Sequence, residues 1–82
     1  MQEPTVFIVD DDAAVCDSLT LMIEQAGMHV QSFENAKTFL NAYQPNFFGC
    51  VIIDVKMPGM DGLQLQEELA WRKILLPVIF LT

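Results

Sequence analysis

The stretch that most constrains the fold is residues 50–62, CVIIDVKMPGMDG, where an apolar run ends in a single carboxylate. Residues 50–53 are apolar and partly β-branched, and the residues from Lys56 to Gly62 are rich in turn formers. A short apolar run bounded by turn signals is typical of a strand buried on both faces. We therefore expect Asp54 at the carboxyl end of a central strand, where ligands and chemistry collect in open parallel sheets.

The rest of the chain alternates between strand and helix patterns. Strands are predicted at about 5–9, 28–33, 50–53 and 77–81, and helices at about 13–26, at about 36–43 and for roughly three turns after Asp61. The run at 28–33 is the most polar of the four, which favours the edge of a sheet. Alternation with short connections predicts parallel βαβ units, and hence an α/β fold of the flavodoxin-like type with helices on both faces of the sheet.

The helices carry recognisable caps and apolar faces. Asp12, Asn35 and Asp61 each stand before a helical pattern and are predicted N-caps. The apolar stripe expected on the first helix consists of Val15, Leu19, Met22, Ile23 and Ala26. The apolar face of the second helix consists of Ala36, Phe39, Leu40 and Tyr43. The apolar face of the third helix consists of Leu65 and Leu69. These stripes are the predicted helical share of the core.

Composition limits the possible functions. Eighty-two residues allow one small domain, and the net charge of −7 with four basic residues argues against direct nucleic-acid binding. No apolar run is long enough for a membrane span, and there is no signal-peptide pattern. Cys16 and Cys50 lack metal-site spacing, so we expect buried free thiols. These features predict a cytoplasmic protein that does not interact with membranes.

Acidic residues follow two of the predicted strands. If the first and third strands are neighbours, Asp10, Asp11 and Asp54 share a pocket at their carboxyl ends. Like charges at such proximity need a cation, and oxygen ligands of this kind suit Mg²⁺. A carboxylate beside Mg²⁺ can attack phosphorus and form an aspartyl-phosphate. Thr82, at the end of the fourth strand, would be within reach of that phosphate.

Three segments give the chain a resemblance to a known family. They are Val6–Asp12 (VFIVDDD), Ile53–Gly62 (IDVKMPGMDG) and Pro77–Thr82 (PVIFLT). In this order and over the whole chain they make the sequence similar to the receiver domain of a two-component response regulator. Further likeness lies in Ser32–Ala36, Phe39–Leu40 and Gly49–Cys50. It resembles the FixJ-like branch, whose output domain is a LuxR-type helix-turn-helix.

The resemblance implies a role for each site residue. Asp54 is the phosphoacceptor, and the donor is a sensor histidine kinase. Asp11 and Asp54 bind Mg²⁺ through their side chains, Lys56 offers its backbone carbonyl, and Asp10 helps to hold the metal through water. Thr82 is the switch hydroxyl. Phosphorylation would then bias a two-state surface that controls an output domain, which we expect to be a DNA-binding transcriptional regulator. The chain itself is expected to be no enzyme, beyond self-phosphorylation from small donors and autodephosphorylation.

The resemblance also implies a strand order of 2-1-3-4 and an incomplete domain. Residues 1–82 are expected to form a single receiver domain that lacks the family's fifth strand and last two helices. Val78–Leu81 is apolar at every position, which is the pattern of a strand covered on both faces, but without those elements we expect it to be an exposed edge with partly bare faces. Left as an edge, this strand would favour pairing with another chain. We therefore expect a dimer or other self-association through the fourth strand.

Two alternatives remain open. A haloacid-dehalogenase-type phosphatase also uses Asp after its first strand, and Asp10, Asp12 and Thr82 could imitate its pattern. However, Ala14 stands where that motif requires Thr or Val, and residues 56–62 would be unexplained. The second alternative is a receiver-like interaction module that works without phosphorylation. Treatment with a small phosphoryl donor separates the three hypotheses of receiver domain, phosphatase and interaction module.

Overall fold

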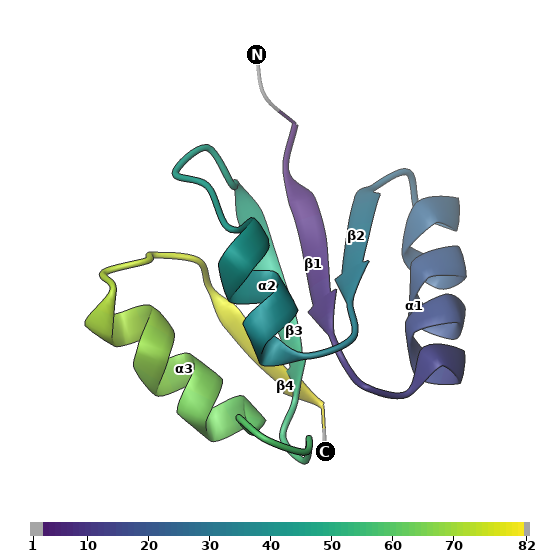
Figure 1. The fold of residues 1–82 in the computed structure, drawn as a ribbon. Coiled ribbons are helices and arrows are strands. Elements are labelled where there is room, and N and C mark those ends of the chain that lie inside the picture. Colours follow the sequence, from purple (N-terminus) through teal and green to yellow (C-terminus); the bar gives the residue numbers. More distant parts are fainter. Residues whose placement is uncertain (1–2, 82) are drawn as a thin grey trace.

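The computed structural model describes residues 3–81, in which four strands alternate with three helices (Figure 1). The elements are β1 (Thr5–Val9), α1 (Ala13–Gln25), β2 (His29–Phe33), α2 (Ala36–Ala42), β3 (Gly49–Asp54), α3 (Gly62–Trp71) and β4 (Val78–Leu81). Each predicted element is present, with bounds that differ by a few residues at most.

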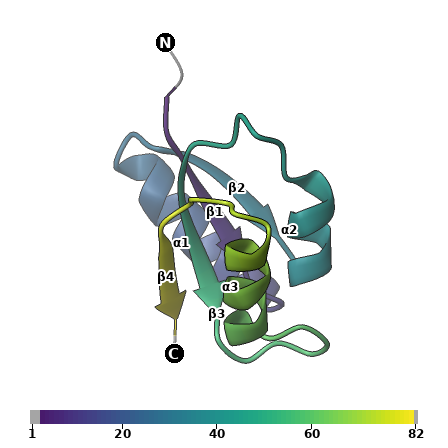
Figure 2. The ribbon, with the colours of Figure 1, turned by 90° about the vertical axis from the view of Figure 1, so that its left-hand side faces the viewer.

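The strands form one parallel sheet in the order β2-β1-β3-β4, as predicted. β1 and β3 lie side by side with Val9 opposite Ile53, and β3 pairs with β4 so that Asp54 is opposite Leu81. Helix α1 lies on one face of the sheet, and α2 and α3 lie on the other (Figure 2). This arrangement places the carboxyl ends of β1, β3 and β4 at one edge, where a site can form.

The core has two parts because side chains of a strand alternate between the faces of the sheet. Phe7 and Val9 point toward α2 and α3, into the larger cluster. Val6 and Ile8 point toward α1, into a smaller cluster that includes Cys16. In the larger cluster the ring of Phe47, a residue of the α2–β3 loop, stacks on Phe7 with centroids 4.6 Å apart.

The predicted helix caps are all formed. The carboxylate of Asp12 accepts hydrogen bonds from the amides of Ala14 and Val15. The side chain of Asn35 accepts from the amide of Thr38, and that of Asp61 accepts from the amide of Gln64, which closes a capping box. These bonds satisfy amides at the first turns that have no partner within the helix.

The predicted stripe of α1 is wrong in two residues, Met22 and Ala26, which are exposed, and β4 is partly bare, as expected for an edge strand. Met22 of the expected α1 stripe is 64% exposed, whereas Leu19 and Ile23 are partly buried beside Cys16. β4 is only half covered: Val78 and Phe80 pack on the larger cluster, but Ile79 is 51% exposed. Ile79 pairs with Ile52, which faces the α1 side of the sheet, and α1 packs mainly along β2 and β1. The helix therefore does not reach across to β4.

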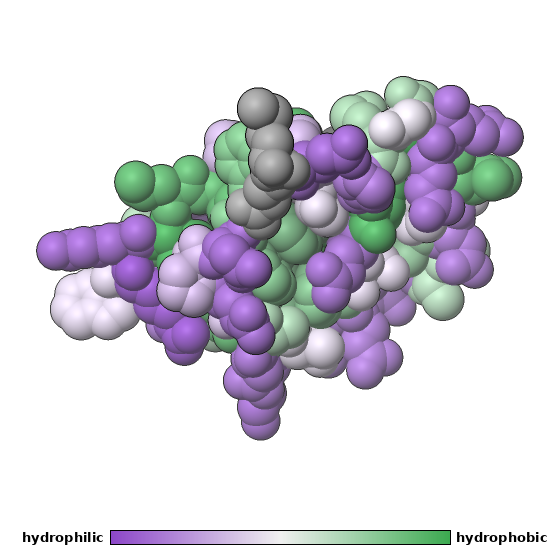
Figure 3. Space-filling view, turned by 90° about the horizontal axis from the view of Figure 1, so that it is seen from above, coloured by the Kyte–Doolittle hydropathy of each residue, from purple (hydrophilic) through white to green (hydrophobic). Residues whose placement is uncertain are grey.

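The surface at the amino ends of the strands carries both hydrophilic and hydrophobic side chains (Figure 3). Phe48 and Leu75, which are 52% and 93% exposed, belong to the loops at this end of the sheet. Cys16 is buried and Cys50 is half-buried, and neither forms a disulfide. No helix among residues 3–81 is long and apolar enough to span a membrane.

Candidate metal and phosphoacceptor site

The carboxyl ends of β1 and β3 bring three acidic side chains together. One carboxylate oxygen from each of Asp10, Asp11 and Asp54 lies within 4.8 Å of the other two. Asp10 is buried, Asp54 is half-buried and Asp11 is exposed. The site is therefore buried on the side of Asp10 and open to solvent on the side of Asp11.

Asp10 is the most constrained of the three acids. Its Oδ1 accepts a hydrogen bond of 2.9 Å from the amide of Asp12, and its backbone carbonyl accepts one of 3.3 Å from the thiol of Cys16. Burial raises the pKa of Asp10, and the nearby charges of Asp54 and Asp11 raise it further, against the lowering effect of the Asp12 amide. A cation beside this carboxylate would stabilise its charged form and so offset the effects of both burial and repulsion.

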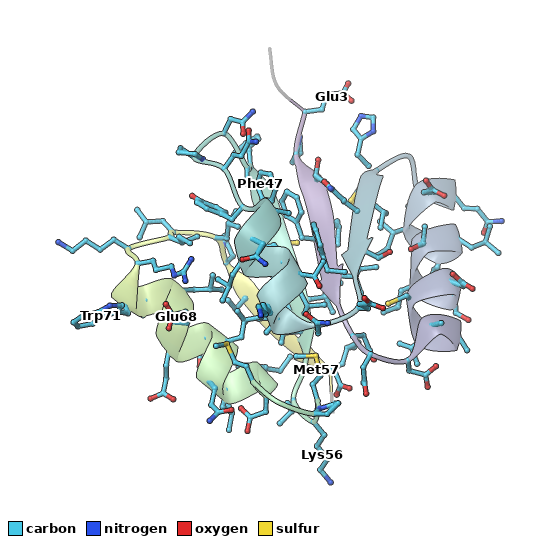
Figure 4. All side chains as sticks on the ribbon, in the orientation of Figure 1. Glu3, Phe47, Lys56, Met57, Glu68 and Trp71 are labelled. Atoms are coloured by element: carbon cyan, nitrogen blue, oxygen red, sulfur yellow. The ribbon has the colours of Figure 1, made fainter. Side chains whose placement is uncertain are left out.

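Asp54 is held at the end of β3 by the turn that follows it. The amide of Lys56 donates a hydrogen bond of 3.2 Å to Oδ1 of Asp54. The side chain of Lys56 is exposed and extends away from the body of the protein (Figure 4). The proposed metal contact of Lys56 involves its backbone carbonyl, and this part of the site stays a prediction.

The β3–α3 loop is fixed against the sheet from two directions. The side chain of Met57 is buried in the larger core cluster. The amide of Gly62 donates a 3.0 Å hydrogen bond to the carbonyl of Val55, and a β-carbon at Gly62 would overlap the carbonyl oxygen of Asp54. The sequence signals identified a tight turn here but did not decide whether Met57 packs inside or points to solvent.

The donor set fits a hard divalent cation. The three clustered side chains offer carboxylate oxygens, and Mg²⁺ prefers oxygen ligands. Among residues 3–81 the ion pairs are His29 with Glu3 and Arg72 with Glu68, so no basic side chain neutralises the three acids. Their combined negative charge is thus available to a bound metal.

One predicted site residue cannot be placed. Thr82, the expected switch hydroxyl, lies outside the described residues. Its neighbour Leu81 is the register partner of Asp54 in the β3–β4 pair. The role of Thr82 stays a prediction.

A parallel sheet of this order, with acids at its carboxyl edge and helices on both faces, is a flavodoxin-like fold. A chemotaxis protein of Vibrio cholerae, CheY4, shares this fold with a TM-score of 0.86 at 22% identity, over 96% of this chain and 68% of that one. The chain belongs to the response regulator receiver domain family, whose model matches residues 6–82.

Named relatives agree with this assignment. The chain is 49% identical over 78 residues to the transcriptional regulatory protein TdiR of Thauera aromatica, covering 95% of this chain and 34% of TdiR. It is 39% identical over 77 residues to the transcriptional regulatory protein FixJ of Bradyrhizobium diazoefficiens, covering 94% of this chain and 38% of FixJ. The solved structure of the response regulator StyR superposes with a TM-score of 0.93 at 42% identity, over 96% of this chain and 40% of that one. The chain thus spans a little over a third of the length of these proteins.

The family assignment accounts for residues that the phosphatase alternative leaves unexplained. The match includes residues 56–62, which follow Asp54 in the receiver pattern. The phosphatase hypothesis explains Asp10 and Asp12 but gives residues 56–62 no function. Asp12 is the N-cap of α1, with its carboxylate on the amides of Ala14 and Val15.

Proposed function

We propose that this chain is the phosphoacceptor domain of a two-component phosphorelay and that Asp54 receives the phosphoryl group. The observation that carries the proposal is the clustering of the Asp10, Asp11 and Asp54 carboxylates within 4.8 Å at the carboxyl edge of the sheet. The proposed donor is the phosphohistidine of a sensor kinase. Membership of the receiver family supports this assignment.

In this mechanism Asp54 is the nucleophile. The Lys56 amide engages Oδ1, and among residues 3–81 no hydrogen bond reaches Oδ2, which can therefore attack phosphorus. The new bond joins Oδ2 to phosphorus, and the bond between phosphorus and the donor nitrogen breaks with its electron pair left on the imidazole. Mg²⁺ would be held by the side chains of Asp11 and Asp54, by the Lys56 carbonyl and by Asp10 through water, and it would supply charge neutralisation for the phosphoryl oxygens. Thr82 would contact the resulting phosphate.

The proposed consequence is a switch that acts through an output domain. The chain covers about a third of TdiR and FixJ, which are named as transcriptional regulators. We propose a cytoplasmic, DNA-binding regulator as the parent protein. The 82-residue segment has a net charge of −7, so contact with DNA is assigned to the output domain.

We also propose that the 82-residue species self-associates through β4. Among the described residues this strand has β3 as its hydrogen-bonded neighbour on one side, and Ile79 is 51% exposed beside the half-buried Ile52. An exposed apolar edge strand favours pairing with a second strand. Sedimentation equilibrium is expected to show a dimer at high micromolar concentration. A well-protected monomer in amide exchange at that concentration would contradict the proposal.

Intact-mass measurement tests the phosphoacceptor assignment. Incubation with acetyl phosphate and Mg²⁺ is expected to add one phosphoryl group, which hydroxylamine removes as expected for an acyl phosphate. Glu24→Gln, which removes an exposed charge on α1, is the matched control and should be labelled like the parent. Turnover of p-nitrophenyl phosphate would indicate a phosphatase, and an unchanged mass would favour an interaction module that works without phosphorylation.

A further inference from the structure

The side chain of Trp71 is a large aromatic group that the fold does not use. Trp71 is the last residue of α3 and the single tryptophan of the chain, and it is 83% exposed. Its ring extends away from the body of the protein (Figure 4). Tryptophan is enriched at the centres of protein–protein interfaces and among the residues that contribute most to binding.

Trp71 forms one wall of a shallow groove along α3. The groove has a volume of about 650 Å³ and is lined by Gly59, Met60, Gln64, Glu67, Glu68 and Trp71. Glu67 and Glu68 each lie three or four positions from both Gln64 and Trp71, so the four side chains form one stripe on the helix surface. Gly59 and Met60 come from the β3–α3 loop and complete the lining. Asp10, Asp11 and Asp54 are not part of it.

The charges that line this groove are both negative. Glu68 accepts a hydrogen bond of 2.7 Å from Nε of Arg72, which is itself outside the lining set. Glu67 is exposed and forms no ion pair with any residue in 3–81. An indole face beside a carboxylate is a suitable site for a cation, because the ring attracts the charge and the carboxylate pairs with it.

The chemistry favours arginine over other occupants. A guanidinium can stack on an indole and bind a carboxylate at the same time, which the compact ammonium of lysine does less well. The thioether of Met60 adds an adaptable apolar contact for the neighbouring side chain of a bound segment. The net charge of −7 attracts a cationic partner and disfavours nucleic acids and anionic membranes. A second copy of the chain fits poorly, because its single arginine, Arg72, already pairs with Glu68.

We propose that the α3 groove docks an arginine-bearing segment of a partner protein, with the guanidinium stacked on Trp71 and paired with Glu67. The groove is formed by one helix and the loop before it, and its function does not depend on phosphoryl transfer to Asp54. The two proposals can therefore fail separately.

Trp71 also provides the measurement. The probe is a short capped peptide with two arginines and one leucine. The control is the same peptide with citrulline in place of each arginine. Titration of the arginine peptide is expected to change the Trp71 emission and to shift backbone amide resonances of residues 59–71. The citrulline peptide, which keeps the shape but not the charge, is expected to do neither.

Variants locate the binding site. Glu67→Gln is expected to weaken binding about fivefold, the size of one exposed ion pair. Trp71→Leu is expected to weaken binding by a similar factor through loss of the cation–π contact. Because this variant has no tryptophan emission, calorimetry measures its affinity for the peptide. Glu24→Gln on α1 removes the same charge far from the groove and should bind like the parent. Circular dichroism checks that each variant keeps the fold, which is expected because these side chains are exposed.

Five results would overturn the proposal. These are no binding of the arginine peptide at millimolar concentration, equal binding of the citrulline peptide, and equal loss in Glu24→Gln and Glu67→Gln. The fourth is a set of resonance shifts centred on residues 10, 11 and 54 and abolished by Mg²⁺, which would place the peptide in the acidic site. A shift of Trp71 emission with protein concentration alone would assign the groove to a second copy and equally contradict the proposal.

Discussion

Gly62 lies directly against the backbone carbonyl of Asp54, at a distance that leaves no room for a side chain. A β-carbon at position 62 would overlap this oxygen and would lie 2.9 Å from Cα of Val55. The amide of Gly62 also donates to the carbonyl of Val55 at 3.0 Å. The start of α3 and the end of β3 are therefore packed as one unit, so the position of the proposed phosphoacceptor depends on backbone contact as well as on its own side chain.

The first prediction concerns this contact. Gly62→Ala is expected to lower the free energy of unfolding by about 1–3 kcal/mol, because an added methyl group forces the backbone apart. It should also slow phosphoryl uptake from acetyl phosphate, since Asp54 moves with the loop. Urea unfolding and intact mass measure the two effects. Gln66→Ala, on the exposed face of α3, is the control and should change neither. A Gly62→Ala protein with parental stability would show that the loop relaxes freely.

The second prediction tests the nucleophile. Asp54→Asn is expected to abolish phosphoryl uptake, because the amide keeps the shape of the side chain but cannot form the aspartyl-phosphate. Its remaining oxygen can still accept the hydrogen bond from the Lys56 amide, so the fold should persist. Intact mass and circular dichroism make the comparison. Undiminished acyl phosphate on the variant would assign the phosphoacceptor to another residue.

The third prediction concerns the metal. Mg²⁺ is expected to raise the melting temperature, because it binds the assembled acids of the folded state; at ten times its dissociation constant the gain is about 1.4 kcal/mol. Asp11→Asn should remove most of this effect, whereas Glu24→Gln should keep it. The same melts in millimolar Ca²⁺ show whether the pocket prefers the smaller ion. No change in the parent chain would mean that the carboxylates do not bind the metal together.

The strand order and the acidic cluster were predictable because they depend on local patterns and on one topological rule. Apolar runs mark the strands, short βαβ connections make them parallel, and parallel strands then bring Asp10 and Asp54 to one edge. The caps were predictable for the same reason, because Asp12 and Asp61 act on amides within their own first turns.

Other features depend on packing that a periodic pattern does not contain. Met22 continues the helical period of α1, but the helix covers mainly β1 and β2, so the buried stripe is narrower than the apolar one. Phe47 follows a proline and an asparagine in a loop, and its stacking on Phe7 has no periodic signal. The groove at Trp71 requires the β3–α3 loop to lie beside α3, which sequence spacing alone does not fix.

The fourth prediction is a pH dependence caused by Asp10. Its pKa is raised in the folded protein, first by burial and then by neighbouring carboxylates, so the folded state holds this proton more tightly than the unfolded state. Without metal, the stability that Asp10 contributes is present below its unfolded pKa of about 4 and is lost as pH rises through the raised folded value. Melts from pH 4 upward should show this fall in the parent, less of it in Asp10→Asn, and its reversal by Mg²⁺ near neutral pH. The same slope in both proteins would remove Asp10 as the cause.

The last prediction concerns the opposite end of β3, where Gly49 meets Thr5. Gly49 has φ +137°, a value that residues with side chains rarely adopt, and its register partner in β1 is Thr5. A β-carbon on Gly49 would overlap the carbonyl oxygen of Thr5 and lie 2.7 Å from its nitrogen, which itself donates to Phe48. Gly49→Ala therefore combines backbone strain with a clash against backbone atoms that cannot move without breaking the β1–β3 pairing.

The expected loss in the free energy of unfolding of Gly49→Ala is about 3 kcal/mol or more, a large share of the stability of so small a domain. Gly27→Ala is the matched control, because Gly27 also has positive φ but faces open space, so it should lose only about 1–2 kcal/mol. Denaturant unfolding of the two variants separates clash from strain. Equal losses would show that β1 shifts to accommodate the methyl group, and Mg²⁺ binding at the far end of these strands would then report whether that shift reaches Asp10 and Asp54.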